Sequence, residues 1–259
     1  MGREPTLDGM QAPLVVPIHH SPLNTAKSYL LLGERVVIVD SGPPDAERRG
    51  HKVRRALAAC GRSADDVSLI LATHSHPDHV GNTVGLRDWC GAPVAIDPKE
   101  SAFVAGTDRL SRTPTGLAGR LFLRTPLPYE EFDHFTPDLL VDDAFDLRRF
   151  GVNADVHRCG GHTPGSLALH CPGSGELIAA DLFAGGVGIG GLAFHGRVIE
   201  PPFHEDRATV IRAAERLLAL GGLTTIHVCH GGPLDPENVT RWVRRAKAAL
   251  AGAQVSAPW

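Results

Sequence analysis

The stretch VSLILATHSHPDHVGN, residues 67–82, decides the fold. Its first part, residues 67–72, is apolar, rich in β-branched residues and too short for a helix, which predicts a buried parallel strand. The polar segment that follows, HSHPDH at 74–79, holds three histidines and an aspartate within six residues. Loops at the carboxyl ends of strands hold the ligands in α/β sheets. The segment therefore predicts a metal site rather than four separately hydrogen-bonded side chains.

The four polar side chains fall into two pairs. His74 and His76 are two residues apart and can share one ion. Asp78 and His79 lie further along, at the turn into the next helix, where they can reach a second ion. Imidazole suits zinc, and a carboxylate completes a site that keeps one position open for water.

Three later residues share the context of this loop. Each comes at the end of a predicted strand and next to glycine or a turn: His162 in CGGHTPGS, Asp181 in LIAADLF and His230 in IHVCHGGP. A local cluster cannot close a dinuclear site by itself. We therefore expect these three side chains to converge on the 74–79 loop.

Strands and helices alternate along the chain, which indicates an α/β sheet within one domain spanning residues 1–259. Strands are predicted at 28–32, 36–40, 67–72, 93–96, 139–141, 144–147, 155–159, 166–170, 177–180 and 224–229, and helices at 46–60, 84–90, 205–220 and 236–250. The pattern breaks at about 101–138, where prolines interrupt it. A segment of this length is either a lid or binding element, or a surface excursion without a role.

Composition narrows the class of protein. The net charge of −3 gives no polycationic surface for nucleic acid or an anionic membrane. No secretory signal and no apolar stretch of about 20 residues is evident. The five cysteines are odd in number and show no CxxC pairing, which argues against a disulfide framework. We expect a soluble, cytoplasmic protein that acts on a small molecule, as a monomer or a homodimer.

Taken together, these motifs resemble the metallo-β-lactamase superfamily, and the resemblance covers most of the chain. HxHxDH at 74–79, GHTPGS at 161–166, Asp181 after a strand and His230-Gly231 occur in the order of that family, and VIVDSG at 37–42 resembles its early strand end. The resemblance implies an αββα sandwich, in which two mixed sheets pack face to face with helices outside. It also implies that Asp40 supports the ligand loop from behind.

The resemblance assigns each candidate ligand. His74, His76 and His162 would bind the first metal, Asp78, His79 and His230 the second, and Asp181 would bridge them. Two zinc ions are implied, with iron or manganese as alternatives. Two metals roughly 3.5–4 Å apart can hold a bridging hydroxide, because metal binding lowers the pKa of water from 15.7 to about 7. Asp78 would be the catalytic residue that orients this hydroxide or relays its proton.

The predicted activity is hydrolysis of a small organic ester, thioester or lactone. An iron-dependent, oxygen-using enzyme such as a persulfide dioxygenase, a β-lactamase-type amide hydrolase and a non-catalytic metal-binding member are the alternatives. The loop after Asp181 runs GGVGIGGL and lacks the arginine of many glyoxalase II-like relatives. No cationic set for a glutathione carboxylate is evident either. Both departures weaken a glutathione thioester as the substrate.

Several further side chains have two readings each. Cys159 and Cys229 are expected to be small buried residues at strand ends, with zinc thiolates as the alternative. His195 and His204 flank the loop after Asp181, and we expect one of them to line the substrate cleft. The aromatic residues of the insertion form either an apolar lid over the metals or a small core of their own; they are Phe103, Phe122, Tyr129, Phe132 and Phe135.

Overall fold

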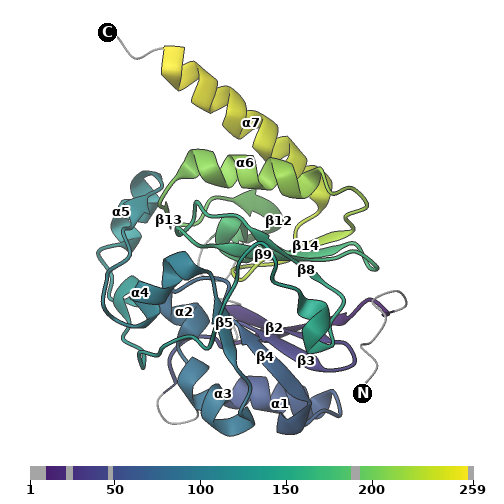
Figure 1. Ribbon diagram of the computed structural model, residues 1–259. Coiled ribbons are helices and arrows are strands. Elements are labelled where there is room, and N and C mark those ends of the chain that lie inside the picture. The colour runs from purple at the N-terminus through teal and green to yellow at the C-terminus, as the bar shows by residue number, and fades with distance from the viewer. Residues whose placement is uncertain (1–9, 22–25, 46–48, 188–192, 256–259) are drawn as a thin grey trace.

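A computed structural model describes residues 10–21, 26–45, 49–187 and 193–255. Two β-sheets lie face to face in the middle of the molecule, and helices cover both outer faces (Figure 1). This four-layer arrangement confirms the predicted αββα sandwich.

The first sheet has six strands in the order β1-β2-β3-β4-β5-β7. Their bounds are β1 (Leu14–His19), β2 (Lys27–Leu32), β3 (Val36–Val39), β4 (Val67–Leu71), β5 (Val94–Ile96) and β7 (Leu139–Leu140). β1, β2 and β3 pair antiparallel, whereas β3, β4, β5 and β7 run parallel. The sheet is therefore mixed, and β4 lies inside it, as its apolar sequence predicts.

The second sheet has four strands in the order β14-β10-β9-β8. They are β8 (Asp155–Arg158), β9 (Leu167–Cys171), β10 (Glu176–Ile178) and β14 (Thr225–His227). β10 pairs parallel with β14 and antiparallel with β9, and β9 pairs antiparallel with β8. This sheet is mixed as well.

Alternate residues of each strand face opposite sides of its sheet, so the strands contribute to separate core clusters on their two faces. On β4, Leu69 and Leu71 belong to the cluster between the two sheets, while Ile70 belongs to the cluster beneath the outer helices. All three side chains have no exposed surface. Complete burial of a leucine or isoleucine contributes about 1.5–3 kcal/mol, so both faces of β4 stabilise the fold.

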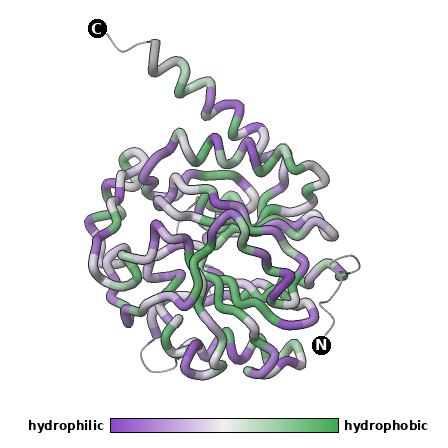
Figure 2. The backbone as a smooth tube through the Cα atoms, in the orientation of Figure 1, coloured by the Kyte–Doolittle hydropathy of each residue, from purple (hydrophilic) through white to green (hydrophobic). Residues whose placement is uncertain are grey.

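Four long helices cover the sheets. On the first sheet, α1 (His51–Ala59) and α3 (Thr83–Cys90) bury Leu57 and Leu86. On the second, α6 (Arg207–Leu218) and α7 (Pro236–Val255) bury Val210, Ala214 and Val239. Figure 2 shows the hydrophobic colour along the central strands, while α6 and α7 alternate in colour along their length. The far end of α7 extends beyond the body of the molecule (Figure 1).

The segment at 101–138 contains short elements of its own. They are α4 (Ser101–Val104), which follows the 3₁₀ turn η2 (Pro98–Glu100), then β6 (Thr113–Pro114), α5 (Gly116–Phe122) and η3 (Leu127–Tyr129). β6 pairs antiparallel with β13 (Phe203–His204), which lies just before α6. The insertion is thereby tied to the second half of the chain.

One predicted strand was wrong, and an edge strand and a hairpin were not predicted. The strand predicted at 144–147 is a turn leading into the 3₁₀ helix η4 (Leu147–Phe150), because the Asp146 carboxylate accepts a hydrogen bond from Arg148 N at 3.0 Å and caps that helix. The edge strand β1 was not predicted. Neither was the hairpin of β11 (Ala184–Val187) and β12 (Ala193–Ile199), in the glycine-rich segment that was read as a loop.

Other predictions are settled only within the described residues. The helix predicted at 46–60 is present from His51, and residues 46–48 lie outside the described residues, as do 188–192 of the glycine-rich loop. All five cysteines are free. Across the described ranges, no helix is both long enough and apolar enough to cross a membrane.

Candidate metal centre

The 74–79 loop leaves the buried end of β4 and turns at once into the short helix α2 (Pro77–Val80). Pro77 stands at the first helical position, where its missing N–H costs nothing, and His76 before it is extended. This turn places Asp78 and His79 on the helix, while His74 and His76 stay on the loop before it. The sequence thereby provides two groups of side chains from one loop.

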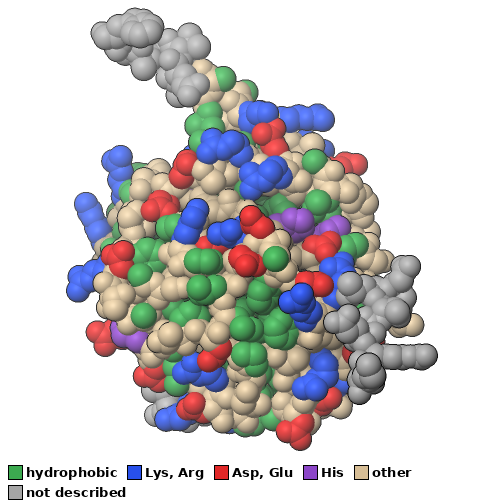
Figure 3. Space-filling view, viewed as in Figure 1, with side chains coloured by type: hydrophobic (Ala, Val, Ile, Leu, Met, Phe, Trp, Pro, Cys, Tyr) green, Lys and Arg blue, Asp and Glu red, His purple; other side chains and the backbone are tan. Residues whose placement is uncertain are grey.

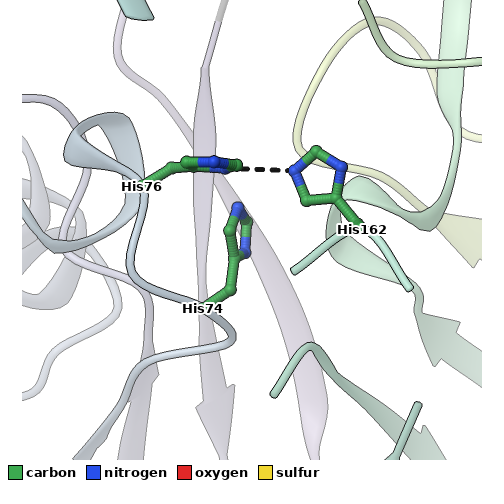
Figure 4. A group of neighbouring side chains, drawn as sticks. All are labelled: His74, His76 and His162. Carbon is green, nitrogen blue, oxygen red and sulfur yellow. Dashed lines mark hydrogen bonds between the residues drawn. The ribbon is translucent and has the colours of Figure 1, made fainter. Parts of the chain in front are cut away.

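The first group joins His74 and His76 to His162 of the GHTPGS loop. The three ring centroids are 4.7, 4.8 and 4.9 Å apart, so the rings form a nearly equilateral triangle (Figure 4). His162 Nε2 lies 3.1 Å from His76 Nδ1. All three histidines are buried.

The second group joins Asp78 and His79 to His230, which follows β14. Asp78 Oδ2 lies 3.3 Å from His230 Nε2 and 3.8 Å from His79 Nε2. In each of the two groups, one nitrogen or carboxylate oxygen per residue lies within 4.8 Å of the others, a separation at which they could hold a metal ion.

Asp181 lies between the groups. Its Oδ2 atom is 3.6 Å from His162 Nε2, 3.5 Å from His79 Nε2 and 3.0 Å from His230 Nε2. Asp181 also forms a third candidate metal group with His74 and His79. The structure therefore brings all seven predicted side chains together and sets the predicted bridging carboxylate where it reaches both groups.

Buried atoms without partners show that these residues fit a metal. His74 Nε2, His76 Nε2, His79 Nε2 and Asp181 Oδ1 are inaccessible to solvent and form no hydrogen bond within the described part of the chain. A buried polar atom left unpaired costs about 1–3 kcal/mol. Histidine nitrogens with carboxylate oxygens form the donor set that zinc prefers. A divalent cation would satisfy these atoms together.

The electrostatics of the cluster also favour a cation. Burial lowers the pKa of His74, His76 and His162, the value for His76 to about 3, so their nitrogens stay neutral. For His230, burial acts in the same direction, but the carboxylates of Asp181 and Asp78 outweigh it and raise the pKa to about 10. These two carboxylates attract positive charge, and a metal ion can take the place of that proton.

Asp40 holds the ligand loop from behind, as expected. Its carboxylate accepts hydrogen bonds from Thr73 N at 2.7 Å, Thr73 Oγ1 at 2.8 Å and His79 Nδ1 at 2.8 Å. The last bond keeps the proton on Nδ1, so the Nε2 lone pair of His79 faces the cluster. Asp40 itself has a φ of 61°, a left-handed conformation that aspartate tolerates better than most residues.

The two cysteines near the site are buried thiols. Cys229 Sγ lies 3.7 Å from Asp40 Oδ2, and Cys229 forms with Asp40 and His79 a further group whose atoms could hold a metal ion. Burial raises the pKa of Cys229 to about 12, and that of Cys159 likewise to about 12. Both thiols are therefore protonated at neutral pH in the metal-free protein.

Glu100 joins the two ligand loops and was missed by sequence reasoning. It ends η2 and is fully buried. Its carboxylate accepts from Ser75 N at 3.0 Å and from Ser75 Oγ in the first loop, and from Gly165 N at 2.7 Å in the second. No sequence signal marks it, because its partners come from segments 25 and 65 residues away.

Two side chains of β2 hold the strand end that carries His230. Tyr29 Oη donates to Val228 O at 2.7 Å, and Lys27 Nζ donates to Gly231 O. Both acceptors lie within two residues of His230 in the sequence. The first sheet thereby fixes a ligand that the second sheet supplies.

An aromatic wall stands beside the three-histidine group. Phe203 lies 5.1 Å from the His76 ring and 5.7 Å from the His162 ring, and Phe122 of α5 stacks on Phe203 at 6.2 Å. His204 Nδ1 lies 3.2 Å from His162 Nδ1, whereas His195 is exposed on β12.

Of the two extra histidines, His204 therefore contacts the site. Among the insertion aromatics, Phe122 belongs to the wall beside the candidate ligands. Phe132 and Phe135 pack into the main core under the first sheet, so they do not form a separate core of the insertion.

Comparisons with known proteins agree with this geometry. The sequence model of the metallo-beta-lactamase superfamily matches residues 23–230. "Probable metallo-hydrolase MJ0888" of Methanocaldococcus jannaschii is 27% identical over 176 residues, which are 63% of this chain and 70% of that protein. The hydroxyacylglutathione hydrolase of Rhizobium meliloti is 28% identical over 195 residues, or 71% of this chain and 60% of that protein. The crystal structure of the metallo-beta-lactamase family protein TTHA1429 of Thermus thermophilus superposes with a TM-score of 0.64 at 25% identity, covering 95% of this chain and 84% of that one.

Proposed function

Because this chain belongs to the metallo-beta-lactamase superfamily, we propose that it is a metal-dependent hydrolase of a small organic ester, thioester or lactone. The observation that carries the proposal is the convergence of seven side chains, five of them buried and four with a buried atom that has no hydrogen-bond partner. They are His74, His76, Asp78, His79, His162, Asp181 and His230.

The proposed cofactor is a pair of zinc ions, with iron or manganese as the alternatives to be tested. His74, His76 and His162 would hold one ion, Asp78, His79 and His230 would hold the other, and Asp181 would contact both. When bound, the ions supply a Lewis acid and a water whose pKa falls from 15.7 to about 7. The protein's part is to hold the ligands, to admit the substrate and to manage protons.

Asp78 is the proposed catalytic residue. Its side chain is 34% exposed, whereas that of Asp181 is 6% exposed, so Asp78 is accessible from outside. Burial opposes its ionisation, yet His79 and His230 lower the pKa of Asp78 below the usual value. An ionised carboxylate at an accessible position can accept a hydrogen bond from the attacking water and orient it.

Three observations support the substrate class. The Phe203–Phe122 wall offers an apolar surface to an acyl group beside the three histidines. One relative is named for a thioester substrate, hydroxyacylglutathione. Acidic and basic side chains are mixed over the face drawn in Figure 3, which suits a small molecule better than a nucleic acid.

The test is a substrate panel with defined metal content. Protein freed of metal with a chelator is reloaded with Zn²⁺, Mn²⁺ or Fe²⁺ and assayed on a 4-nitrophenyl ester, an acylglutathione, a γ-lactone, a β-lactam and a phosphodiester. We expect hydrolysis of the ester, thioester or lactone. Asp78→Asn should reduce it by at least about 100-fold, within the range general acid–base groups contribute. The exposed Asp108→Asn is the matched control.

Three results would contradict the proposal. Metal-loaded protein that hydrolyses no member of the panel would remove the hydrolase assignment. Cleavage of the β-lactam alone would move the activity to amides. Oxygen consumption with a persulfide by the iron form, without hydrolysis, would favour the oxygen-using alternative.

A further inference from the structure

The ligand cluster opens toward solvent at Asp78 and His230. Their side chains are 34% and 26% exposed, whereas those of His79, His162 and Asp181 are 1%, 2% and 6% exposed. A substrate of the proposed hydrolase must therefore approach past Asp78. Charged groups beside Asp78 are placed to select among substrates.

The backbone holds Arg112 of the insertion near the three-histidine group of the cluster. The next residue, Thr113, begins β6 and pairs with His204 of β13. His204 in turn contacts the candidate ligand His162 through ring nitrogens 3.2 Å apart. The register of β6 on β13 thus fixes Arg112 close to the cluster, although the two segments are distant in the sequence.

The Arg112 side chain lies against an aromatic ring and is incompletely paired. Its guanidinium carbon is 5.1 Å from the centroid of the Tyr129 ring. Its Nε atom is buried without a hydrogen-bond partner, and within the described residues no carboxylate lies within ion-pair distance of the guanidinium. An unsatisfied buried donor requires an explanation, and a ligand that arrives on binding provides one.

Electrostatic effects agree with this placement. Burial lowers the pKa of Arg112, and the negative charge of Asp78 acts against that lowering. Arg112 in turn adds to the effect of burial and of His79 in lowering the pKa of His76. Glu130 is a second charged group on this side, and burial together with Asp78 raises its pKa. Arg112 is therefore a partly desolvated cation close enough to Asp78 for the two charges to interact.

We propose that Arg112 recognises a carboxylate on the substrate, so that the ester, thioester or lactone cleaved here is an acidic one. This rests on the proposed hydrolase function and adds its substrate class. A guanidinium binds a carboxylate through two parallel charge-assisted hydrogen bonds, and Tyr129 fixes its plane for this contact. The substrate's carboxylate lies on Arg112 while its scissile carbonyl lies at the candidate ligands.

The experiment compares two esters of equal chain length, mono-4-nitrophenyl glutarate and 4-nitrophenyl valerate, on metal-loaded protein. Wild-type protein should prefer the acidic ester in kcat/KM. Arg112→Gln should reduce kcat/KM for the glutarate ester by about 10- to 100-fold, mainly through KM, because one charged contact is lost. The valerate ester should change less than about twofold.

Three variants serve as controls. Arg109→Gln removes the same charge from an exposed position three residues away and should change neither ester. Arg112→Lys keeps the charge without the planar fork and should recover part of the loss. Glu130→Gln removes a negative charge from the opening and should improve KM for the acidic ester. An equal loss on both esters in Arg112→Gln, or no loss on either, would overturn the proposal.

Direct binding separates this proposal from the hydrolase assignment. Glutarate is titrated by calorimetry into metal-loaded wild type, Arg112→Gln and Arg109→Gln. We expect weaker binding, by at least about tenfold, only in Arg112→Gln, whether or not the wild type hydrolyses esters. If neither ester is cleaved but glutarate binding still depends on Arg112, the proposed function fails and the carboxylate site stands. Equal binding to all three proteins would refute the carboxylate site.

Discussion

Replacing Asp40 with asparagine should weaken metal binding although no candidate ligand is substituted. The Asp40 carboxylate accepts three hydrogen bonds, two from Thr73 and one from His79 Nδ1. Asparagine offers one acceptor oxygen and one NH₂ group in the same space. With the NH₂ toward Thr73 N, two donors meet at about the former 2.7 Å separation. With the NH₂ toward His79, the imidazole must change tautomer, and its Nε2 then carries a proton instead of a lone pair.

The effect of either amide orientation on stability and on metal affinity can be estimated. Loss of one bond to a buried charged acceptor costs about 1.5–3 kcal/mol. A side chain that orients a metal ligand contributes roughly 10–100-fold in metal affinity. We therefore expect Asp40→Asn to lower the free energy of unfolding of the metal-free protein by about 2 kcal/mol, and to raise the zinc dissociation constant at least about tenfold.

The assay is zinc competition against a chromophoric chelator at pH 7, with urea unfolding of the metal-free protein beside it. Asp138→Asn is the matched control, since its carboxylate accepts from Val94 N at 2.8 Å on the same sheet but away from the cluster. The control should lose stability and keep its zinc affinity. Unchanged zinc affinity in Asp40→Asn would refute the tautomer argument, even if the protein were destabilised.

Four further predictions follow from the site and the core. Removing metal with a chelator should lower the Tm by about 8–16 °C if zinc is present at about a thousand times its dissociation constant, and zinc should restore it; an unchanged Tm on scanning calorimetry would exclude a site of that affinity. Carboxylates raise the pKa of His230 to about 10 against the effect of burial, so His230 holds a proton at pH 7 in the metal-free protein, and carboxylates also raise the pKa of His79. Zinc binding should therefore release protons and become tighter as pH rises. Calorimetry in buffers of different ionisation enthalpy measures the release, and zinc binding without it would contradict this prediction. Asp181→Ala should lower metal content below two per chain by atomic absorption, and full occupancy would contradict its place between the groups. Leu69→Ala should cost about 2–5 kcal/mol in urea unfolding with unchanged metal content, and a loss below about 1 kcal/mol would contradict the packing between the sheets.

The sequence predicted those parts of the site that local pattern encodes. The 74–79 loop can be recognised in the sequence, because its four candidate ligands come shortly after an apolar strand. His162, Asp181 and His230 could be found because each ends a strand beside glycine or a turn. The convergence of their side chains then follows from the two sheets facing each other.

Residues that act through long-range contacts could not be predicted. Glu100 binds two loops distant in sequence, and Arg112 reaches the opening only through the pairing of β6 with β13. Neither role leaves a trace in composition or periodicity. The sequence showed no evident cationic set for a glutathione carboxylate, and the proposed carboxylate site at Arg112 could not be predicted from it.

The missed strands have physical reasons as well. β1 is an edge strand that contains Pro17 and is half exposed, so its apolar pattern is weak. β11 reads as a loop because of its glycines, yet a Cβ on Gly185 would lie 1.9 Å from Gly232 O. Glycine is required there for the close approach that gives the Gly185–Gly231 bridge beside His230. The composition that suggests a flexible loop in fact allows tight backbone packing.

Anomalous diffraction at the zinc edge, from crystals of protein loaded with zinc, tests the central claim most directly. We expect two peaks, roughly 3.5–4 Å apart. One should lie within the triangle of His74, His76 and His162 and the other between His79 and His230, with Asp181 in contact with both. A map without a peak in reach of Asp181, or with zinc bound only elsewhere on the protein, would contradict it.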